Sequence, residues 1–297
     1  MSLPFAVRLT RPRLIIMAAV LAIAGLLATV TGLTGSAHAA TARATRAGAA
    51  SWTSGPKPAI VLVHGAWADS GSWNGVIGRL QAAGYTVYAP PNPLRGVSYD
   101  SDYLADFLSP TSTAITGPVV LVGHSYGGFT ITNAATGNPN VKALVYVDAF
   151  IPAQGDTLLG LASAVPGSCL NPSSSFNTAP YPDPPVTGDV DLYVKPSLFP
   201  GCFANGLPPA EGAVLAATQR PLAESVLGEA SGPPAWTTIP SWAIVGTADH
   251  VIPPAGQLFM AQRAGATITE IDAPHLSMIA DPGAVAAVII QAAQATS

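Results

Sequence analysis

Residues 118–128 have the sequence Pro-Val-Val-Leu-Val-Gly-His-Ser-Tyr-Gly-Gly, which is the clearest indication of fold in this chain. The first half of this stretch is an apolar, β-branched run, and its second half places Ser125 between Gly123 and Gly127. A G-x-S-x-G sequence directly after a strand is typical of a nucleophile elbow, because glycine leaves room for neighbouring backbone at a sharp turn. Residues 129–135 follow with a pattern that fits a helix. The sequence therefore predicts a strand, a turn that projects a serine into a pocket, and a helix.

Strand-like and helix-like segments alternate on both sides of this turn. The strand-like runs are 59–63, 85–89, 118–122, 141–147, 242–245 and 266–271, and the helix-like runs are 73–80, 101–108, 129–135, 255–264 and 284–293. This alternation predicts an α/β domain with a mostly parallel, six-stranded sheet and helices on both faces. Its length suits a single domain, which we expect to occupy residues 57–297.

Residues 151–236 interrupt the alternation. This segment is rich in proline, holds both cysteines and has only a few helix-like pieces, such as 211–227. Because long insertions inside a compact domain usually serve function, we interpret it as an inserted lid that is irregular but ordered.

The two cysteines of the chain are Cys169 and Cys202. Export would carry them into an oxidising compartment, so we predict a disulfide between them, with two buried free thiols as the alternative. Neither lies beside a histidine in the sequence, which argues against a thiolate nucleophile.

The first 39 residues indicate a secretory signal peptide. Three arginines precede an apolar run at residues 14–30, and Ala37-His38-Ala39 is a small-residue cleavage site. An uncleaved membrane anchor is the alternative, because the run approaches the roughly 20 residues of a spanning helix. We expect cleavage near Ala39, a linker at 40–56 and a secreted, extracellular protein.

Composition narrows the class of partner. Only 9% of the residues are charged and the formal net charge is -4, which disfavours nucleic acid and anionic membrane surfaces as partners. The sequence has no Gly-rich phosphate loop ending in Gly-Lys, no H-E-x-x-H pair and no Cys/His cluster with metal spacing. We therefore expect a small-molecule substrate, no cofactor and no metal; the oligomeric state stays open.

A serine hydroxyl is a weak nucleophile, so it needs a histidine to take its proton and an acid to orient that histidine. In sheets of this kind the partners follow in the order serine, acid, histidine, each after a strand. His275 follows the last strand and Asp249 the strand before it, so we predict that they form a triad with Ser125. Asp148, at the end of the run 141–147, is the alternative acid.

The negative oxygen of a tetrahedral intermediate needs preorganised N–H donors. One should be the amide of Tyr126, directly after the serine at the start of a helix. The other should come from the loop after the first strand, where we favour Ala66, with Trp67 as the alternative donor or a wall of the pocket. We expect His64 and His124 to form hydrogen bonds that shape their loops.

These motifs resemble the α/β-hydrolase superfamily over nearly all of residues 57–297. The sequences at 61–67 (VLVHGAW), 123–128, 148–152 and 275–278 are similar to the branch that holds plant methylesterases, hydroxynitrile lyases and related bacterial esterases. The resemblance implies an α/β-hydrolase fold, the same triad and an oxyanion hole made by Ala66 and Tyr126.

Two positions narrow the chemistry that the resemblance implies. Hydroxynitrile lyases of this branch carry a lysine after the catalytic histidine, whereas this chain has Leu276, and Ser125 argues against the aspartate nucleophile of haloalkane dehalogenases and epoxide hydrolases. The expected function is a secreted carboxylic-ester hydrolase that acts through an acyl-enzyme on small or medium uncharged esters. The alternatives are a cofactor-free perhydrolase or haloperoxidase-type activity, and a non-catalytic ligand-binding protein of the same fold.

Overall fold

The computed structural model describes residues 57–111 and 115–297, so the predicted signal peptide and linker lie outside the described residues. In this part of the chain a six-stranded parallel sheet has the order β2-β1-β3-β4-β8-β9. The strands are β1 (Ala59–Val63), β2 (Val87–Tyr88), β3 (Val119–His124), β4 (Val141–Val147), β8 (Ser241–Gly246) and β9 (Thr267–Ile271). Every residue of β3 is buried, as expected for a central strand of a sheet covered on both faces. The predicted fold class is confirmed.

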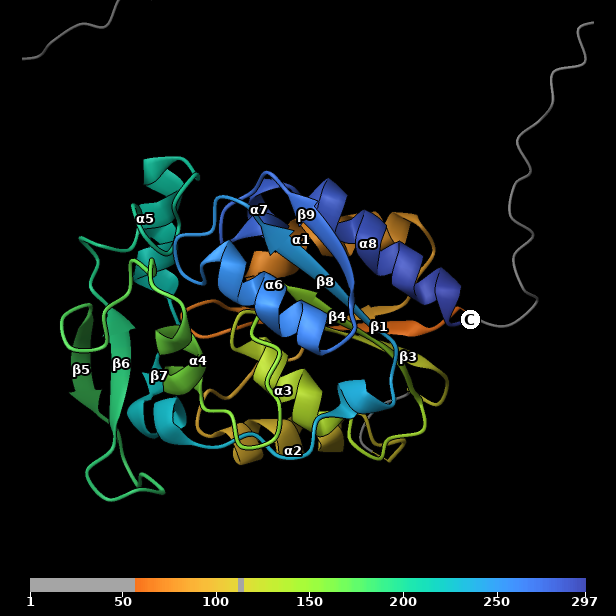
Figure 1. The fold of residues 1–297 in the computed structure, drawn as a ribbon, viewed down its shortest axis with the longest axis horizontal. Coiled ribbons are helices and arrows are strands. Elements are labelled where there is room, and N and C mark those ends of the chain that lie inside the picture. The colour runs from red at the N-terminus through yellow and green to blue at the C-terminus, as the bar shows by residue number, and fades with distance from the viewer. Residues whose placement is uncertain (1–56, 112–114) are drawn as a thin grey trace, which may run out of the picture. The chain divides into compact units, whose positions relative to one another are not determined.

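Helices cover both faces of this sheet (Figure 1). On one face the helix α1 (Asn74–Ala82), entered through the 3-10 turn η1 (Ser70–Trp73), packs beside α7 (Ser277–Ala280) and α8 (Pro282–Ala295). On the other face α2 (Val97–Phe107) packs against α3 (Gly127–Ala134). The helix α6 (Pro254–Arg263) lies against β8 and β9.

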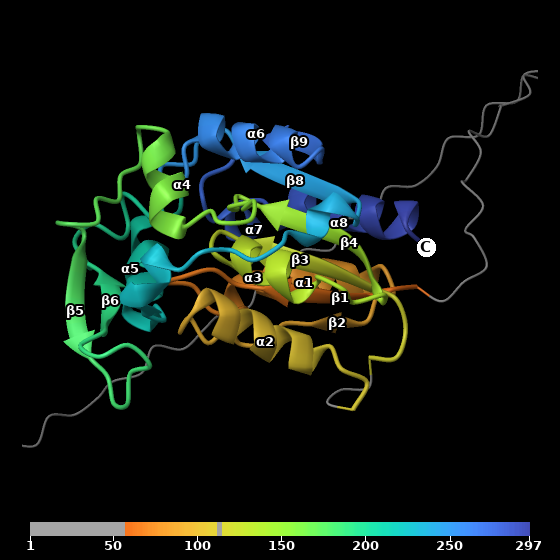
Figure 2. The ribbon, with the colours of Figure 1, turned by 60° about the horizontal axis from the view of Figure 1, so that its bottom comes forward.

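The lid, residues 151–236, is more regular than the sequence predicted. Its elements are α4 (Leu158–Ala164), β5 (Phe176–Pro180), β6 (Val190–Val194), α5 (Pro209–Thr218), β7 (Leu222–Ala223) and the 3-10 turn η2 (Glu224–Gly228); the turn η3 (Ala235–Thr237) spans its end. The three strands form an antiparallel sheet, β5-β6-β7. Figures 1 and 2 both show β5, β6 and α4 beyond one end of the main sheet. The expectation of an irregular lid was wrong. The three strands have two to five residues each, which is too few for a clear alternation of apolar and polar residues to reveal them in the sequence.

Two expected helices differ in their bounds. The run expected at 211–227 is α5 followed by β7 and η2, because Pro221 has no N–H to donate and disfavours a helical conformation at Arg220. The helix expected at 101–108 begins earlier, at Val97, where the Glu229 carboxylate accepts hydrogen bonds from the first N–H groups of α2. That partner is more than 130 residues away in the sequence, so local pattern could not reveal it. The strand expected at 85–89 is confined to Val87–Tyr88.

The predicted disulfide is present. Cys169 and Cys202 are bonded, with their Cα atoms 5.7 Å apart and a sequence separation of 33 residues. The bond joins the loop after α4 to the segment before α5, and therefore ties together the two parts of the lid that lie on either side of β5 and β6.

Candidate active site

Ser125 lies on a tight turn between β3 and α3. Its φ of 53° is in the left-handed region, which residues with a side chain rarely adopt. A Cβ at Gly123 would lie 2.5 Å from the carbonyl oxygen of Gly127, and one at Gly127 would lie 2.6 Å from that of Val63. Both positions therefore require glycine, as the G-x-S-x-G sequence predicted, and the turn has the form of a nucleophile elbow.

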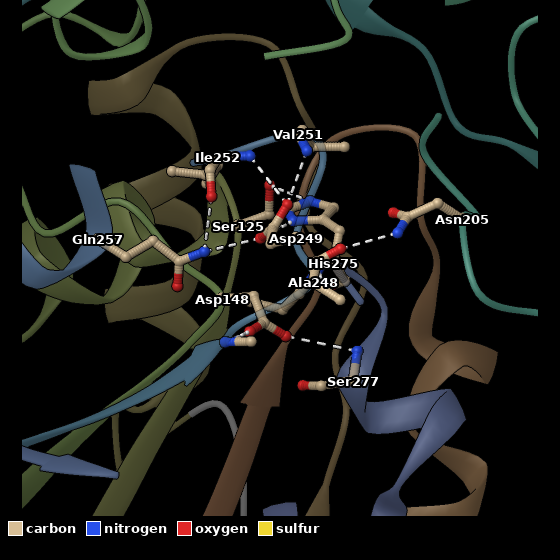
Figure 3. Close-up of polar contacts among 12 residues, drawn as sticks. Ser125, Asp148, Asn205, Ala248, Asp249, Val251, Ile252, Gln257, His275 and Ser277 are labelled. Carbon is tan, nitrogen blue, oxygen red and sulfur yellow. Dashed lines mark hydrogen bonds and ion pairs between the residues drawn. The ribbon is translucent and has the colours of Figure 1, made fainter. Parts of the chain in front are cut away.

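The structure brings together the three residues that the sequence nominated as a triad (Figure 3). His275 Nε2 lies 3.1 Å from Ser125 Oγ, and His275 Nδ1 lies 2.8 Å from Asp249 Oδ2. All three residues are buried. A proton on Nδ1 satisfies the carboxylate and leaves Nε2 free to accept the serine proton, which is the arrangement that an activated serine needs.

The Asp249 carboxylate is held by donors on its own loop and on α6. Oδ1 accepts from the backbone N–H groups of Val251, at 2.7 Å, and Ile252, at 2.9 Å, and Oδ2 accepts from Gln257 Nε2 at 2.7 Å. These bonds keep Oδ2 directed at His275. Sequence patterns did not predict a role for Gln257. The one feature that could have indicated it is that Gln257 is a polar residue on the buried, otherwise apolar face of α6.

Asp148, the alternative acid, takes a different position. Its Oδ1 accepts from the Gly246 N–H at 2.8 Å and its Oδ2 from the Ser277 N–H at 3.4 Å, so it lies between the loop of Asp249 and the loop of His275. Burial, followed by the nearby charge of Asp249, raises the pKa of Asp148 well above its ordinary value. The geometry thus favours Asp249 as the partner of His275.

Two further histidines shape the surrounding loops, as expected. His64 Nδ1 donates to the Gly65 carbonyl and His64 Nε2 accepts from the Asn92 N–H, both at 2.9 Å. His124 Nε2 donates to the His275 carbonyl at 2.9 Å. Burial lowers the pKa of His64 to about 4 and that of His124 well below its ordinary value, so both rings are neutral near pH 7.

The loop after β1 packs directly against the elbow. A Cβ at Gly65 would lie 2.6 Å from Ser125 Cβ, so the two backbones are in close contact. The Trp67 N–H donates to the Arg220 carbonyl at 3.0 Å and is therefore not free to bind an oxyanion. The N–H groups of Ala66 and Tyr126 donate to no acceptor among the described residues. This arrangement favours the pair that the sequence nominated.

The side chain of Tyr126 is anchored on the side away from the cavity. Its hydroxyl donates to Asp100 Oδ2 at 2.7 Å, and Asp100 Oδ1 accepts from the Arg95 N–H at 3.0 Å. Burial raises the pKa of Asp100 to about 6, against the lowering effect of these hydrogen bonds. The residue that would supply one oxyanion donor is thereby fixed to α2.

A cavity of about 90 Å³ lies beside Ser125, between the elbow and the lid. Its lining comprises Ala66, Trp67, Ser125, Tyr126, Phe150, Leu158, Leu159, Ala162, Ser163, Ser168, Leu170, Pro172, Phe176, Leu227 and Val251. None of these described lining residues is charged, and most are aliphatic or aromatic. The cavity therefore suits an uncharged, largely apolar group.

Across 57–111 and 115–297, no group of three or more His, Cys, Asp or Glu side chains is placed to hold a metal ion. In the same ranges, no helix combines the length and the apolar character that crossing a membrane requires.

Comparison with known proteins gives two curated relatives. The chain is 36% identical over 111 residues to a carbendazim-hydrolysing esterase of a Nocardioides species, covering 34% of this chain and 46% of the relative. It is 31% identical over 106 residues to a pyrethroid hydrolase of Sphingobium wenxiniae, covering 33% of this chain and 38% of the relative. The matched segments thus span less than half the length of each relative.

A solved structure of similar fold covers more of the chain. It is an extracellular α/β-hydrolase from a Paenibacillus species, described as sharing structural and functional homology with tobacco salicylic acid binding protein 2. The TM-score is 0.63 at 22% identity, over 79% of this chain and 98% of that chain, a likeness that concerns the fold.

A family model also matches most of the chain, because residues 60–288 match the Alpha/beta hydrolase family. This range includes all six strands of the main sheet except the first residue of β1, together with Ser125, Asp249 and His275. The resemblance that the motifs indicated is confirmed, and the chain belongs to the α/β-hydrolase family.

Proposed function

We propose that this protein is a serine carboxylic-ester hydrolase that acts through an acyl-enzyme on small or medium uncharged esters. The observation that carries the proposal is the hydrogen-bonded series Ser125 Oγ, His275 Nε2, His275 Nδ1 and Asp249 Oδ2, at 3.1 and 2.8 Å. The two esterase and hydrolase relatives support the same reaction class.

The proposed acylation begins with attack of Ser125 Oγ on the ester carbonyl carbon. His275 Nε2 takes the serine proton, and Asp249 stabilises the resulting imidazolium. The N–H groups of Ala66 and Tyr126 hold the negative oxygen of the tetrahedral intermediate, where loss of one donor typically costs about 2.7 to 4 kcal/mol. The intermediate then expels the alcohol, which takes the proton from His275.

Deacylation repeats the steps with water as the nucleophile. His275 takes a proton from water, which attacks the acyl carbonyl carbon, and the carboxylic acid leaves as the proton returns to Ser125. The apolar, uncharged lining of the cavity supports uncharged esters, because an ionised group there would lose its hydration without a partner.

The test is covalent labelling with a fluorophosphonate probe, in which Ser125 Oγ bonds to phosphorus and fluoride leaves. We expect the wild type to be labelled and to hydrolyse a series of p-nitrophenyl esters, and Ser125→Ala to lose both properties. Ser163→Ala is a matched control, since Ser163 lines the same cavity without a recorded histidine partner among the described residues, and it should keep both. A wild type that neither reacts with the probe nor cleaves any ester would contradict the proposal and favour a ligand-binding protein.

We also propose export of the protein with removal of a signal peptide. The support is the arrangement of residues 1–40 together with the Cys169–Cys202 disulfide, which suits an oxidising compartment. Mass spectrometry of the protein from the culture medium should give an N-terminus near residue 40, whereas a chain that begins at Met1 in the membrane fraction would indicate an anchor.

A further inference from the structure

Trp67, in the loop after β1, has an unusual backbone conformation. Its φ is 57°, in the left-handed region that a bulky residue adopts only when its surroundings enforce it. It directly follows Ala66, the proposed oxyanion donor. Any group that holds Trp67 in this conformation also restrains the Ala66–Trp67 peptide. That peptide adjoins the Gly65–Ala66 peptide, which carries the Ala66 N–H.

The groups that hold Trp67 come from the lid. Its backbone N–H donates to the Arg220 carbonyl at 3.0 Å, and its indole Nε1–H donates to the Leu192 carbonyl at 2.8 Å. Leu192 lies in β6, and Arg220 lies two residues before β7. Both N–H donors of Trp67 are therefore bonded to backbone carbonyls of the lid, one in β6 and one in the segment that leads into β7.

Aromatic contacts with the lid fix the indole ring as well. The ring stacks on Phe176 of β5 with a centroid distance of 5.0 Å and meets Phe203 edge-on at 5.8 Å. The Phe203 ring in turn contacts His275, at 5.2 Å between centroids. These contacts hold the two sides of the indole ring in the orientation in which its Nε1–H is directed at β6.

The second proposed oxyanion donor is tied to the same strand by another route. The Tyr126 hydroxyl donates to Asp100, which accepts from the backbone of Arg95, and the Arg95 guanidinium forms an ion pair with Asp191 of β6. Asp191 is the immediate neighbour of Leu192. Adjacent residues of β6 thus connect to both sides of the oxyanion hole.

We infer that Trp67 is a positioning residue, through which the β5-β6-β7 sheet of the lid orients the Ala66 N–H in the oxyanion hole. The inference rests on the proposed function. The lid then does more than wall the cavity, because the loop after β1 reaches its working conformation only when Trp67 is bonded to the carbonyls of Leu192 and Arg220.

Trp67→Phe tests this inference, since it removes the indole N–H and keeps an aromatic ring for stacking. Trp236→Phe is the matched control, because Trp236 Nε1 also donates to a carbonyl, that of Pro152, at 2.8 Å, and does not line the cavity. The measurements are kcat and KM for one p-nitrophenyl ester, the rate constant for fluorophosphonate labelling, and Tm.

We expect Trp67→Phe to lower kcat and the labelling rate by about 10- to 100-fold, with KM changed by less than about threefold. The expected loss is smaller than the roughly 100- to 1000-fold that follows removal of a whole donor, because the Ala66 N–H is displaced rather than deleted. Trp236→Phe should keep kcat within about twofold and have a similar effect on Tm.

An unchanged kcat in Trp67→Phe, or a change in KM alone, would overturn the inference and leave Trp67 as a wall of the cavity. Equal losses of kcat in the two variants would also overturn it, since they would follow from stability. A wild type without labelling or turnover would contradict the proposed function instead, which separates the two failures.

A second variant pair tests whether β6 also positions the oxyanion hole by the other route, through Arg95, Asp100 and Tyr126. Asp191→Asn weakens the ion pair with Arg95 outside the cavity, and Asp156→Asn weakens a comparable pair with Arg263. We expect Asp191→Asn to lower kcat several-fold with KM unchanged, and Asp156→Asn to leave both unchanged. Equal kcat values for the two variants would contradict the role of β6.

Discussion

Asp249 and Asp148 are two buried carboxyls at the ends of neighbouring strands, and their hydrogen-bond partners separate their roles. Asp249 faces His275 Nδ1, whereas Asp148 accepts from the backbone of Gly246 and Ser277. Both carboxyls therefore lie at the candidate site, but only that of Asp249 is placed to orient the imidazole of His275.

Substitution by asparagine should distinguish the two. Asp249→Asn is expected to lower kcat by about 10³- to 10⁴-fold, because the amide no longer stabilises the correct tautomer and the imidazolium. Asp148→Asn should keep kcat within about tenfold, since asparagine tolerates the left-handed φ of 44° and can still accept from Gly246. Steady-state kinetics on one ester checks both, and a larger loss for Asp148→Asn would reverse the assignment.

The raised pKa of Asp100 should make the free energy of unfolding depend on pH, and stability measurements can detect this dependence. Burial raises its pKa from 3.8 to about 6, so between these values the folded state holds a proton that the unfolded chain has released. The contribution of Asp100 to the free energy of unfolding is thus fully present below pH 3.8 and is lost as the pH rises through about 6. At 1.36 kcal/mol per pKa unit, the loss is about 3 kcal/mol.

The measurement is urea unfolding of the wild type and Asp100→Asn between pH 4 and pH 7.5. The wild type should lose stability relative to the variant by about 3 kcal/mol over this range. Asp102→Asn, which replaces an exposed carboxyl on the same helix, serves as the control. A difference between wild type and Asp100→Asn that does not vary with pH would contradict the raised pKa of Asp100.

At the scale of elements, the helix α3 is set unusually close to the strand end after β4. Gly128, in the first turn of α3, allows this approach, because a Cβ there would lie 2.0 Å from the backbone carbonyl oxygen of Phe150. A side chain at Gly128 would force the backbone of α3 away from that of Phe150. This would displace α3, whose N-terminus adjoins the elbow.

Gly128→Ala should therefore destabilise the protein despite the better helix propensity of alanine. We expect a loss of several kcal/mol in the free energy of unfolding, from displaced backbone and the strain of overpacking. Gly78→Ala is the matched control in α1, where a Cβ would meet no atom within 4 Å, and it should stabilise by about 0.5 to 1 kcal/mol. Thermal unfolding of both variants gives the comparison, and similar Tm values would contradict the close approach.

At the scale of the whole molecule, the disulfide joins segments of the lid that have separate contacts with the rest of the domain. The backbone N–H of Cys169 donates to the carbonyl of His250, on the loop of Asp249, and Cys202 precedes Phe203, whose ring contacts His275. The bond therefore restricts the part of the unfolded chain that must reassemble around the candidate site.

Reduction should lower the free energy of unfolding by about 3 to 4 kcal/mol, the value that chain entropy gives for a bond across 33 residues. Urea unfolding of the wild type with and without reductant measures this loss. The double variant Cys169→Ala/Cys202→Ala should be less stable than the oxidised wild type and insensitive to reductant. Equal wild-type stability in both conditions would show that the bond contributes nothing measurable.

Much of the architecture follows from local patterns in the chain. The apolar run 118–122 and the glycines around Ser125 predicted β3 and the turn, because a buried strand and a close backbone approach restrict which residues can stand there. The alternation of strand-like and helix-like runs predicted the parallel sheet, because successive parallel strands are connected by helices that cover the faces of the sheet. Chain order then nominated Asp249 and His275, since successive strands of such a sheet end at one edge.

Contacts between distant segments account for what local pattern missed. The lid sheet depends on pairing between short strands, and the start of α2 depends on Glu229, more than 130 residues later. Gln257 belongs to the site because α6 packs beside the loop of Asp249, and that packing is not visible in the sequence.

Periodicity, turn glycines and chain order are properties of the chain that can be recognised without a structure, and they were enough to indicate the family, the sheet and the residues that could form a triad. Three-dimensional contacts were needed to show that Asp249 rather than Asp148 faces His275, that the Trp67 N–H already has a partner, and that the loop after β1 is bonded to the lid. These findings depend on which carbonyl or carboxylate each N–H donor of His275 and Trp67 meets in space. The donors and acceptors are 26 to 153 residues apart along the chain, so local sequence cannot reveal the pairing.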